Sequence, residues 1–225
     1  MKKRNSQNLN TNALLLPMKD RVIFVDWFGV LSNEVFWQKY LDNSTSKWHN
    51  KIAVIKDKIF SNKYLVEEWM KGNYTYEDIL NIIEPNLSVY EKKVLKNSVN
   101  SYCSNLILNE SLVAILKNAS RSAFIVLATD NMDCFFNCLF ALPQLGLFDS
   151  ILSSNNLGIL KKEDPERFFG QWLKNHNIPF ENAILVDDSI LNCREFKKHG
   201  GSYLQYTDTN RDLLSLINWA NQESV

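Results

Sequence analysis

Short apolar runs recur along the chain, and several of them end in polar side chains. The first run, Val22-Ile-Phe-Val25, is followed directly by Asp26 and then, after two aromatic residues, by Gly29. Uninterrupted runs rich in β-branched and aromatic residues are typical of strands buried on both faces of a parallel sheet. The pattern predicts a strand over residues 21–26 and further strands over residues 123–128, 150–153, 183–186 and, more weakly, 202–206.

The segments between the later strands have apolar residues three and four positions apart, as amphipathic helices do. The predicted helices cover residues 109–116, 135–140, 165–173, 189–196 and 211–220. Strands that alternate with helices predict a parallel sheet with right-handed crossovers. The expected fold class is therefore α/β, with a three-layer, Rossmann-like core.

A long segment after the first strand has a different character. It contains no strong buried strand, and its aromatic residues (Trp37, Trp48 and Trp69 among them) fall in helical patterns that favour a packed interior. We expect one helix to begin at Thr75, and Ser88 with Glu91 has the spacing of a capping box. The predicted organisation is a flexible tail (1–19), an α/β core (20–32 and 107–225) and a smaller, inserted helical domain (33–106).

Composition and charge argue against nucleic-acid and membrane partners and against secretion. The 25 basic residues balance the 25 acidic ones, so the chain lacks the charge that nucleic acids and anionic membranes attract. The run Ala13-Leu-Leu-Leu16 is too short for a signal peptide, and no apolar run reaches membrane-spanning length. The four cysteines lack metal-ligand spacing and are expected to be free thiols: Cys103, Cys134, Cys138 and Cys193. We expect a soluble, cytoplasmic protein without a nucleic-acid or membrane partner.

Polar side chains follow three of the predicted strands. Asp26 ends the first, Thr129 the second, and Asp187 with Asp188 the fourth, while a loop carries two adjacent lysines, Lys161 and Lys162. The carboxyl ends of parallel strands meet at one sheet edge, so these groups are expected to share a crevice. Clustered carboxylates suit Mg²⁺, and a hydroxyl with an ammonium suits a phosphoryl group. Asp26 is then a candidate nucleophile that would form an aspartyl-phosphate.

These motifs, in this order, resemble the haloacid dehalogenase-like (HAD) superfamily of hydrolases. The family's first motif, D-x-D-G-[TV]-L, corresponds to Asp26-Trp-Phe-Gly-Val-Leu31, and D-D-S-x-x-N is matched from Asp187 to Asn192. The lysine motif K-P-D-P-x-x-F aligns best with Lys162, whereas the family spacing from Gly158 favours Lys161. In the family the inserted helices form a cap.

The resemblance implies a set of roles. Asp26 would be the nucleophile and a metal ligand, and the backbone carbonyl of Phe28 would join it. The other implied residues are Asp187 and Asp188 as ligands of Mg²⁺, Asn192 as their support, and Thr129, Asp130 and a lysine (Lys162 or Lys161) as binders of phosphate. The expected partner is a small phosphorylated substrate or ligand.

One residue departs from the family pattern. Phe28 stands where HAD phosphatases have the aspartate that acts as general acid and base, and a phenyl ring cannot transfer protons. Loss of such a group lowers rates about 10²–10⁴-fold. Three alternatives follow. The first is a phosphatase that acts on a good leaving group or takes its proton from Asp130 or His49. The second is an enzyme whose phospho-aspartate persists, and the third is a catalytically lapsed protein that binds a phosphorylated ligand or a protein partner. A 2-haloacid dehalogenase is less favoured, because dehalogenases lack the paired carboxylates of Asp187 and Asp188.

Overall fold

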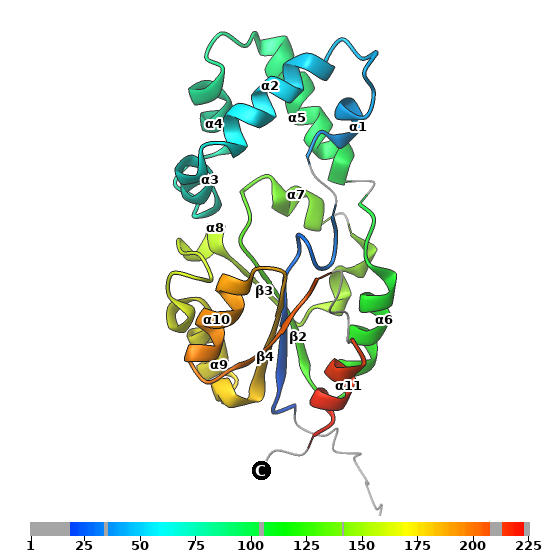
Figure 1. Cartoon of the computed structure of the whole chain (residues 1–225), viewed down its shortest axis with the longest axis vertical. Helices are drawn as coiled ribbons and strands as arrows, with labels where there is room; N and C mark the ends of the chain where they lie inside the picture. The colour runs from blue at the N-terminus through cyan, green and yellow to red at the C-terminus, as the bar shows by residue number, and fades with distance from the viewer. Residues whose placement is uncertain (1–18, 34–35, 104–105, 141, 208–212, 223–225) are drawn as a thin grey trace, which may run out of the picture.

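The structure is a computed structural model that describes residues 19–33, 36–103, 106–140, 142–207 and 213–222. Its centre is a five-stranded parallel sheet with the strand order β3-β2-β1-β4-β5. The strands are β1 (Val22–Val25), β2 (Phe124–Thr129), β3 (Ser150–Ser153), β4 (Ala183–Asp187) and β5 (Ser202–Gln205). Helices cover both faces of the sheet (Figure 1), so the predicted α/β fold class with a Rossmann-like core is confirmed.

Strand β1 lies in the middle of the sheet because it is apolar on both faces. Its four residues pair in register with β2 on one side and with β4 on the other, and all four are fully buried. Side chains alternate between the faces of a strand. Val22 and Phe24 accordingly join one apolar cluster, whereas Ile23 and Val25 join the other.

The two layers of core helices follow from this alternation. On one face lie α9 (Gln171–Asn175) and α10 (Ile190–Lys198), preceded by a π-helical turn at Glu166–Gly170. On the other lie α6 (Glu110–Ala119) and α11 (Leu214–Ala220), which pack against each other. Figure 1 shows these two pairs on opposite sides of the strands. Shorter helical elements connect them: α7 (Phe135–Leu139), α8 (Ser154–Leu157) and 3₁₀ turns at Pro143–Leu147 and Phe180–Asn182.

The chain between β1 and β2 is helical, as its periodicity predicts. This helical segment comprises α1 (Gln38–Leu41), α2 (His49–Phe60), α3 (Lys63–Met70), α4 (Tyr76–Ile83) and α5 (Val89–Cys103). Thr75 caps α4 in a capping box with Asp78. The predicted box before α5 is also present, since Glu91 Oε2 accepts from Ser88 N (2.8 Å) and Glu91 N donates to Ser88 Oγ (3.3 Å). The domain boundaries at residues 33 and 106 stay a prediction, because residues 34–35 and 104–105 are outside the described part.

The helical segment lies over the carboxyl ends of the strands (Figure 1). Helix α3 contacts α8, which directly follows β3, and α5 contacts α7, which follows β2. Asp133, just before α7, accepts hydrogen bonds from Trp69 Nε1 (2.8 Å) and Tyr76 N (3.1 Å). Ser154 Oγ donates to Met70 O at 2.7 Å. Polar contacts thus hold the segment directly above the sheet edge.

Other predictions have simpler outcomes. Residues 1–18 are outside the described part, so the flexible tail stays a prediction. Cys134 and Cys193 are free and buried, as predicted, whereas the side chains of Cys103 and Cys138 fall outside the description. Among the described helices, none combines the length and the apolar character that crossing a bilayer would require.

Candidate functional site

Asp26 is held at the end of β1 by main-chain hydrogen bonds. Its N–H donates to Val186 O at 2.9 Å, which extends the β1–β4 pairing by one residue. Its Oδ1 accepts from Trp27 N at 2.7 Å, and the residue is only 8% exposed. The carboxylate is therefore fixed, with Oδ2 directed to the next group of the site.

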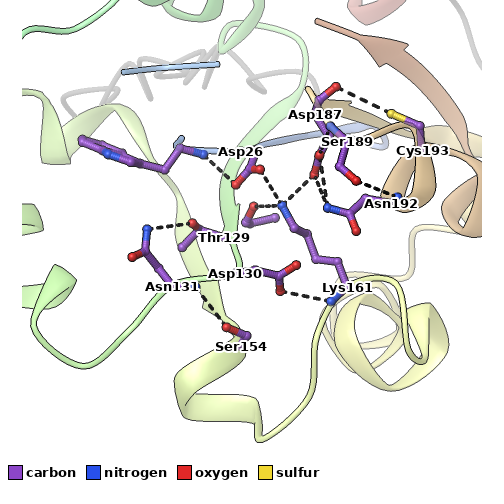
Figure 2. Close-up of polar contacts among 12 residues, drawn as sticks. Asp26, Thr129, Asp130, Asn131, Ser154, Lys161, Asp187, Ser189, Asn192 and Cys193 are labelled. Carbon is purple, nitrogen blue, oxygen red and sulfur yellow. Dashed lines mark hydrogen bonds and ion pairs between the residues drawn. The ribbon is translucent and has the colours of Figure 1, made fainter. Parts of the chain in front are cut away.

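That group is the ammonium of Lys161, at the centre of Figure 2. Lys161 Nζ lies 2.9 Å from Asp26 Oδ2 and 2.6 Å from Asp187 Oδ2, and it donates to Ala128 O at 3.1 Å. All three ammonium donors are thus used by a side chain that is fully buried. A buried charge requires such pairing, because an unpaired one is costly to remove from water.

The neighbouring Lys162 has a different position. Its Nζ lies 2.5 Å from Glu67 Oε1 on α3, in the helical segment. Of the two lysines that the sequence left open, the structure therefore brings Lys161, not Lys162, to Asp26. The catalytic and phosphate-binding roles suggested for Lys162 by motif alignment do not fit this geometry, because the side chains of adjacent residues here point in different directions. The spacing from Gly158 was the better signal.

Asp187 is the most enclosed of the carboxylates. Its Oδ1 accepts from Ser189 N at 2.8 Å, and Asn192 Nδ2 donates to both carboxylate oxygens at 3.1 Å. Ser189 also caps α10 by accepting from Asn192 N. Within the D-D-S-x-x-N sequence, Asp187 thus ends β4, Ser189 caps α10 and Asn192 supports the Asp187 carboxylate. The contact of Asn192 with the Asp187 carboxylate is observed, and its role as support of a metal ligand stays a prediction.

Asp188 approaches the first motif across the sheet edge. A Cβ on Gly29 would lie 2.3 Å from Asp188 Oδ2, which only glycine permits, and Gly29 has a φ of +78°. The glycine thus turns the chain and leaves room for a carboxylate more than 150 residues away in the sequence.

Two residues predicted to bind phosphate lie at the end of β2: Thr129, its last residue, and Asp130, with Asn131 next in the chain. Thr129 is 1% exposed, and its Oγ1 accepts from Asn131 Nδ2 at 3.5 Å. Asp130 Oδ1 accepts from Lys161 N at 3.1 Å. Asn131 N donates to Ser154 Oγ at 3.0 Å, and that hydroxyl reaches Met70 O. The residues after β2 therefore lie between Lys161 and Ser154 (Figure 2), and Ser154 continues the connection to the helical segment.

The charges of the cluster do not balance. Burial raises the pKa of Asp26 well above its usual range, although Lys161 acts in the opposite direction. Burial also raises the pKa of Asp130 and of Asp188. Burial alone would lower the pKa of Lys161, but three neighbouring carboxylates outweigh it and raise that pKa. All four shifts favour bound protons, chiefly through burial for the three carboxyl groups and through the neighbouring carboxylates for Lys161.

The donor set fits a divalent cation. Asp26, Asp187 and Asp188 each offer a carboxylate oxygen, and these oxygens lie within 4.8 Å of one another. Three carboxylates and one ammonium leave a net charge of −2, which a single Mg²⁺ would neutralise. Oxygen ligands from a few carboxylates, completed by water, are the coordination that Mg²⁺ prefers.

Comparison with known proteins identifies the fold. No protein-family model matches the sequence, and no curated protein matches it. The structure is similar to that of a mutant HAD family enzyme from Bacteroides thetaiotaomicron in complex with magnesium and inorganic phosphate. The TM-score is 0.65 and the sequence identity 15%, and the match covers 85% of this chain and 96% of that one. The chain has the HAD-like fold.

Two further structures support this assignment. A predicted HAD-like family hydrolase from Porphyromonas gingivalis has a TM-score of 0.64 and 14% identity, covering 92% of this chain and 100% of that one. The L-2-haloacid dehalogenase of Xanthobacter autotrophicus has a TM-score of 0.58 and 10% identity, covering 84% and 79%. At identities this low the likeness establishes the HAD-like fold, and the chemistry must be argued from the residues themselves.

In this HAD-like fold, Phe28 borders a cavity that Asp130 also lines. The side chain of Phe28 is 49% exposed, and the cavity of about 300 Å³ lies beneath the helical segment. His49, the other suggested proton donor besides Asp130, has its Nδ1 3.2 Å from Tyr40 O within the helical segment and is not brought to the cluster. Asp130 does line the cavity.

Some site groups carried no signal in the sequence. The N–H of Trp27 and the carbonyl of Ala128 bind the charged groups through the main chain, which no residue type reveals. Cys193, whose Sγ lies 3.7 Å from Asp187 O, was expected only as a buried thiol. Its position four residues after Ser189, on the inner face of α10, was the available clue.

Proposed function

We propose that this protein is a Mg²⁺-dependent phosphatase that hydrolyses small phosphomonoesters through an aspartyl-phosphate on Asp26. The observation that carries the proposal is the buried Lys161 ammonium, which bridges the carboxylates of Asp26 and Asp187 while Asp188 stands beside them. Such a cluster has one hydrogen-bonded carboxylate at a strand end, a fixed positive charge and two further oxygen donors.

Each residue has a defined part in this proposal. Asp26 would attack phosphorus, because its carboxylate is fixed by Trp27 N and Lys161 at the edge where ligands bind in parallel sheets. Thr129 and Asn131 would hold the phosphoryl oxygens, and the positive charge of Lys161, whose donors are already used, would attract them. Asp26, Asp187, Asp188 and the carbonyl of Phe28 would hold Mg²⁺, which when bound would supply positive charge to the transferring phosphoryl group.

The helical segment would act as a cap that excludes water. It is fixed above the site by the bonds of Asp133 and Ser154 and by the Lys162–Glu67 pair. Exclusion of water strengthens electrostatic interactions at a reacting centre and suppresses side reactions.

The experiment is phosphate release from acetyl phosphate and from a panel of phosphomonoesters, with and without Mg²⁺. We expect Mg²⁺-dependent turnover by the wild type and its loss in Asp26→Asn. Lys162→Met is a matched control for Lys161→Met, because only Lys161 contacts Asp26. Absence of turnover on every substrate would contradict the proposal.

Phe28 supports a second candidate, a lapsed enzyme that binds a phosphorylated ligand or a protein partner. Intact-mass measurement after exposure to acetyl phosphate separates the alternatives. A stable adduct of one phosphate that is absent in Asp26→Asn would indicate a persistent phospho-aspartate, whereas binding without an adduct would indicate the lapsed form. Dehalogenation is less favoured because the paired carboxylates are retained, and halide release from a 2-haloacid without metal tests it.

A further inference from the structure

A cavity of about 300 Å³ lies between the sheet edge and the helical segment. Its walls include the residues that directly follow Asp26 and Thr129 in the chain, so it adjoins the carboxylate cluster. Five of its lining side chains are aromatic: Trp27, Phe28, Phe36, Phe60 and Phe135. Phe28 and Phe60 are 49% and 43% exposed, and large apolar side chains gathered around one hollow mark a binding site.

The cavity also has a charge preference. Among the described residues that line it, Lys56 is the only cation and Asp130 the only carboxylic acid. Asp130 already accepts from the Lys161 main chain. Lys56, on the cap side, makes no ion pair with any part of the chain that the structure describes. An apolar chamber with a spare ammonium suits an apolar ligand that carries negative charge.

The cavity volume suits a small ligand. One aromatic ring with a small substituent can be accommodated in a cavity of about 300 Å³, at the small end of the range for ligand pockets.

The residue at position 28 restricts the leaving group. Phenols ionise with a pKa of about 10, whereas aliphatic alcohols resemble water, whose pKa is about 15.7. A phenolate therefore leaves phosphorus without a proton far more readily than an alkoxide. Phe28 stands where the resemblance implies an acid, and a phenyl ring cannot donate a proton. This position therefore suits esters of phenols and not esters of aliphatic alcohols.

From the aromatic cavity and the residue at position 28, and resting on the proposed phosphatase function, we propose that the substrates are phosphomonoesters of small phenols. An oxygen of Asp26 forms a bond to phosphorus as the phosphorus–oxygen bond to the ring breaks. The phenolate leaves with the electron pair. Water then attacks the aspartyl-phosphate, restoring the carboxylate and releasing phosphate, and the proton that the water loses passes to solvent.

The test compares three esters. Phenyl phosphate and cyclohexyl phosphate have the same size and apolar character but different leaving groups, and glycerol 3-phosphate is polar. We expect kcat/KM for phenyl phosphate to exceed that for cyclohexyl phosphate by at least about 100-fold, the lower end of what a missing general acid costs. Phe28→Asp should raise the rate on cyclohexyl phosphate and reduce this ratio to less than about tenfold.

Binding is measured separately from turnover. Calorimetry with Asp26→Asn should show phenyl phosphate binding about tenfold more tightly than glycerol 3-phosphate, since only the ring fills the aromatic chamber. Phe60→Ser in the same background should remove this preference. Tyr64→Ser is the matched control, because Tyr64 is 70% exposed and does not line the cavity.

Acetyl phosphate distinguishes failure of the proposed phosphatase function from failure of the assignment of phenol esters. Its leaving group needs neither a ring pocket nor a proton donor. If acetyl phosphate is not hydrolysed, the proposed function fails and the assignment of phenol esters fails with it. If acetyl phosphate is hydrolysed but phenyl phosphate is no better than cyclohexyl phosphate or glycerol 3-phosphate, only the assignment of phenol esters is overturned.

Discussion

Lys161 and Lys162 are adjacent in the chain, yet their ammonium groups bind different parts of the protein. Lys161 Nζ pairs with the buried carboxylates of Asp26 and Asp187, whereas Lys162 Nζ pairs with Glu67 on the helical segment. The loop between α8 and the π-helical turn at Glu166–Gly170 therefore links the carboxylate cluster to the helical segment through two consecutive residues.

This arrangement predicts losses of stability of different size for two matched substitutions. Lys161→Met leaves buried carboxylates without their cation, and breaking a buried pair in this way costs about 3–5 kcal/mol. Lys162→Met removes a partly exposed pair, worth about 0–1 kcal/mol. Urea unfolding of both variants measures the difference, and equal free energies of unfolding would contradict the position assigned to Lys161.

The close approach of Gly29 and Asp188 predicts the effect of one methyl group on metal binding. Gly29→Ala would force Asp188 away and should weaken Mg²⁺ binding at least about tenfold, which calorimetry measures. Gly158→Ala is the control, because Gly158 has a similar φ of +68° but nothing within 4 Å of its added Cβ. Both variants carry the strain of a left-handed residue, about 1–2 kcal/mol, so only the loss of Mg²⁺ affinity separates them. Similar Mg²⁺ affinity in the two variants would refute a role of Asp188 as ligand.

Glu91 predicts a dependence of stability on pH. The Lys51 ammonium, together with the hydrogen bonds from Ser88, lowers the pKa of Glu91 from 4.5 to about 2 in the folded state. A lowered folded pKa stabilises the protein above the unfolded pKa, and this stabilisation is lost as the pH falls from about 4.5 towards about 2. The wild type should therefore be more stable than Glu91→Gln at pH 7, and the difference should shrink below pH 4.5. Urea midpoints of both proteins at several pH values test this, and a constant difference would contradict it.

The two hydrogen bonds that Asp133 accepts from the helical segment predict how firmly this segment is held against the α/β core. The two carboxylate oxygens of Asp133 accept from Trp69 Nε1 and Tyr76 N, one on each side of the turn between α3 and α4. Asp133→Ala should cost about 1.5–3 kcal/mol, the range for hydrogen bonds to a charged group, and should increase hydrogen exchange in α3 and α4. Glu77→Gln serves as a control, since Glu77 makes only an exposed pair with Lys96. Unchanged exchange after Asp133→Ala would show that other contacts hold the cap.

The sequence alone was sufficient to predict the parallel sheet and the polar side chains at the carboxyl ends of its strands. The buried run before Asp26 has no alternation, which requires a central parallel strand, and the same reasoning located Thr129 and Asp187 at neighbouring strand ends. These predictions succeeded because apolar periodicity and the geometry of parallel strands act locally and leave few alternatives.

Other parts of the site depend on contacts between distant segments. The choice between Lys161 and Lys162 depends on which side of a loop faces inward, and the two signals in the sequence, motif alignment and spacing from Gly158, favoured different lysines. Phe28 and Phe60 lie on separate elements and meet only across the cavity, so their joint role had no local signal. The expectation that Trp37, Trp48 and Trp69 belong to the interior agrees with the exposures of Trp37 (2%) and Trp69 (1%), whereas Trp48 is only partly buried.

The central place of β1 also has a consequence for synthesis of the chain. Strand β1 is made first, but both of its neighbours in the sheet come much later, and β4 begins only at Ala183. At roughly 5–20 residues per second, translation takes on the order of 10 s to supply that second neighbour. During this interval the strand that carries Asp26 has an unpaired, wholly apolar edge. The nascent chain is therefore most prone to misassociation, and most dependent on chaperones, before its fourth strand leaves the ribosome.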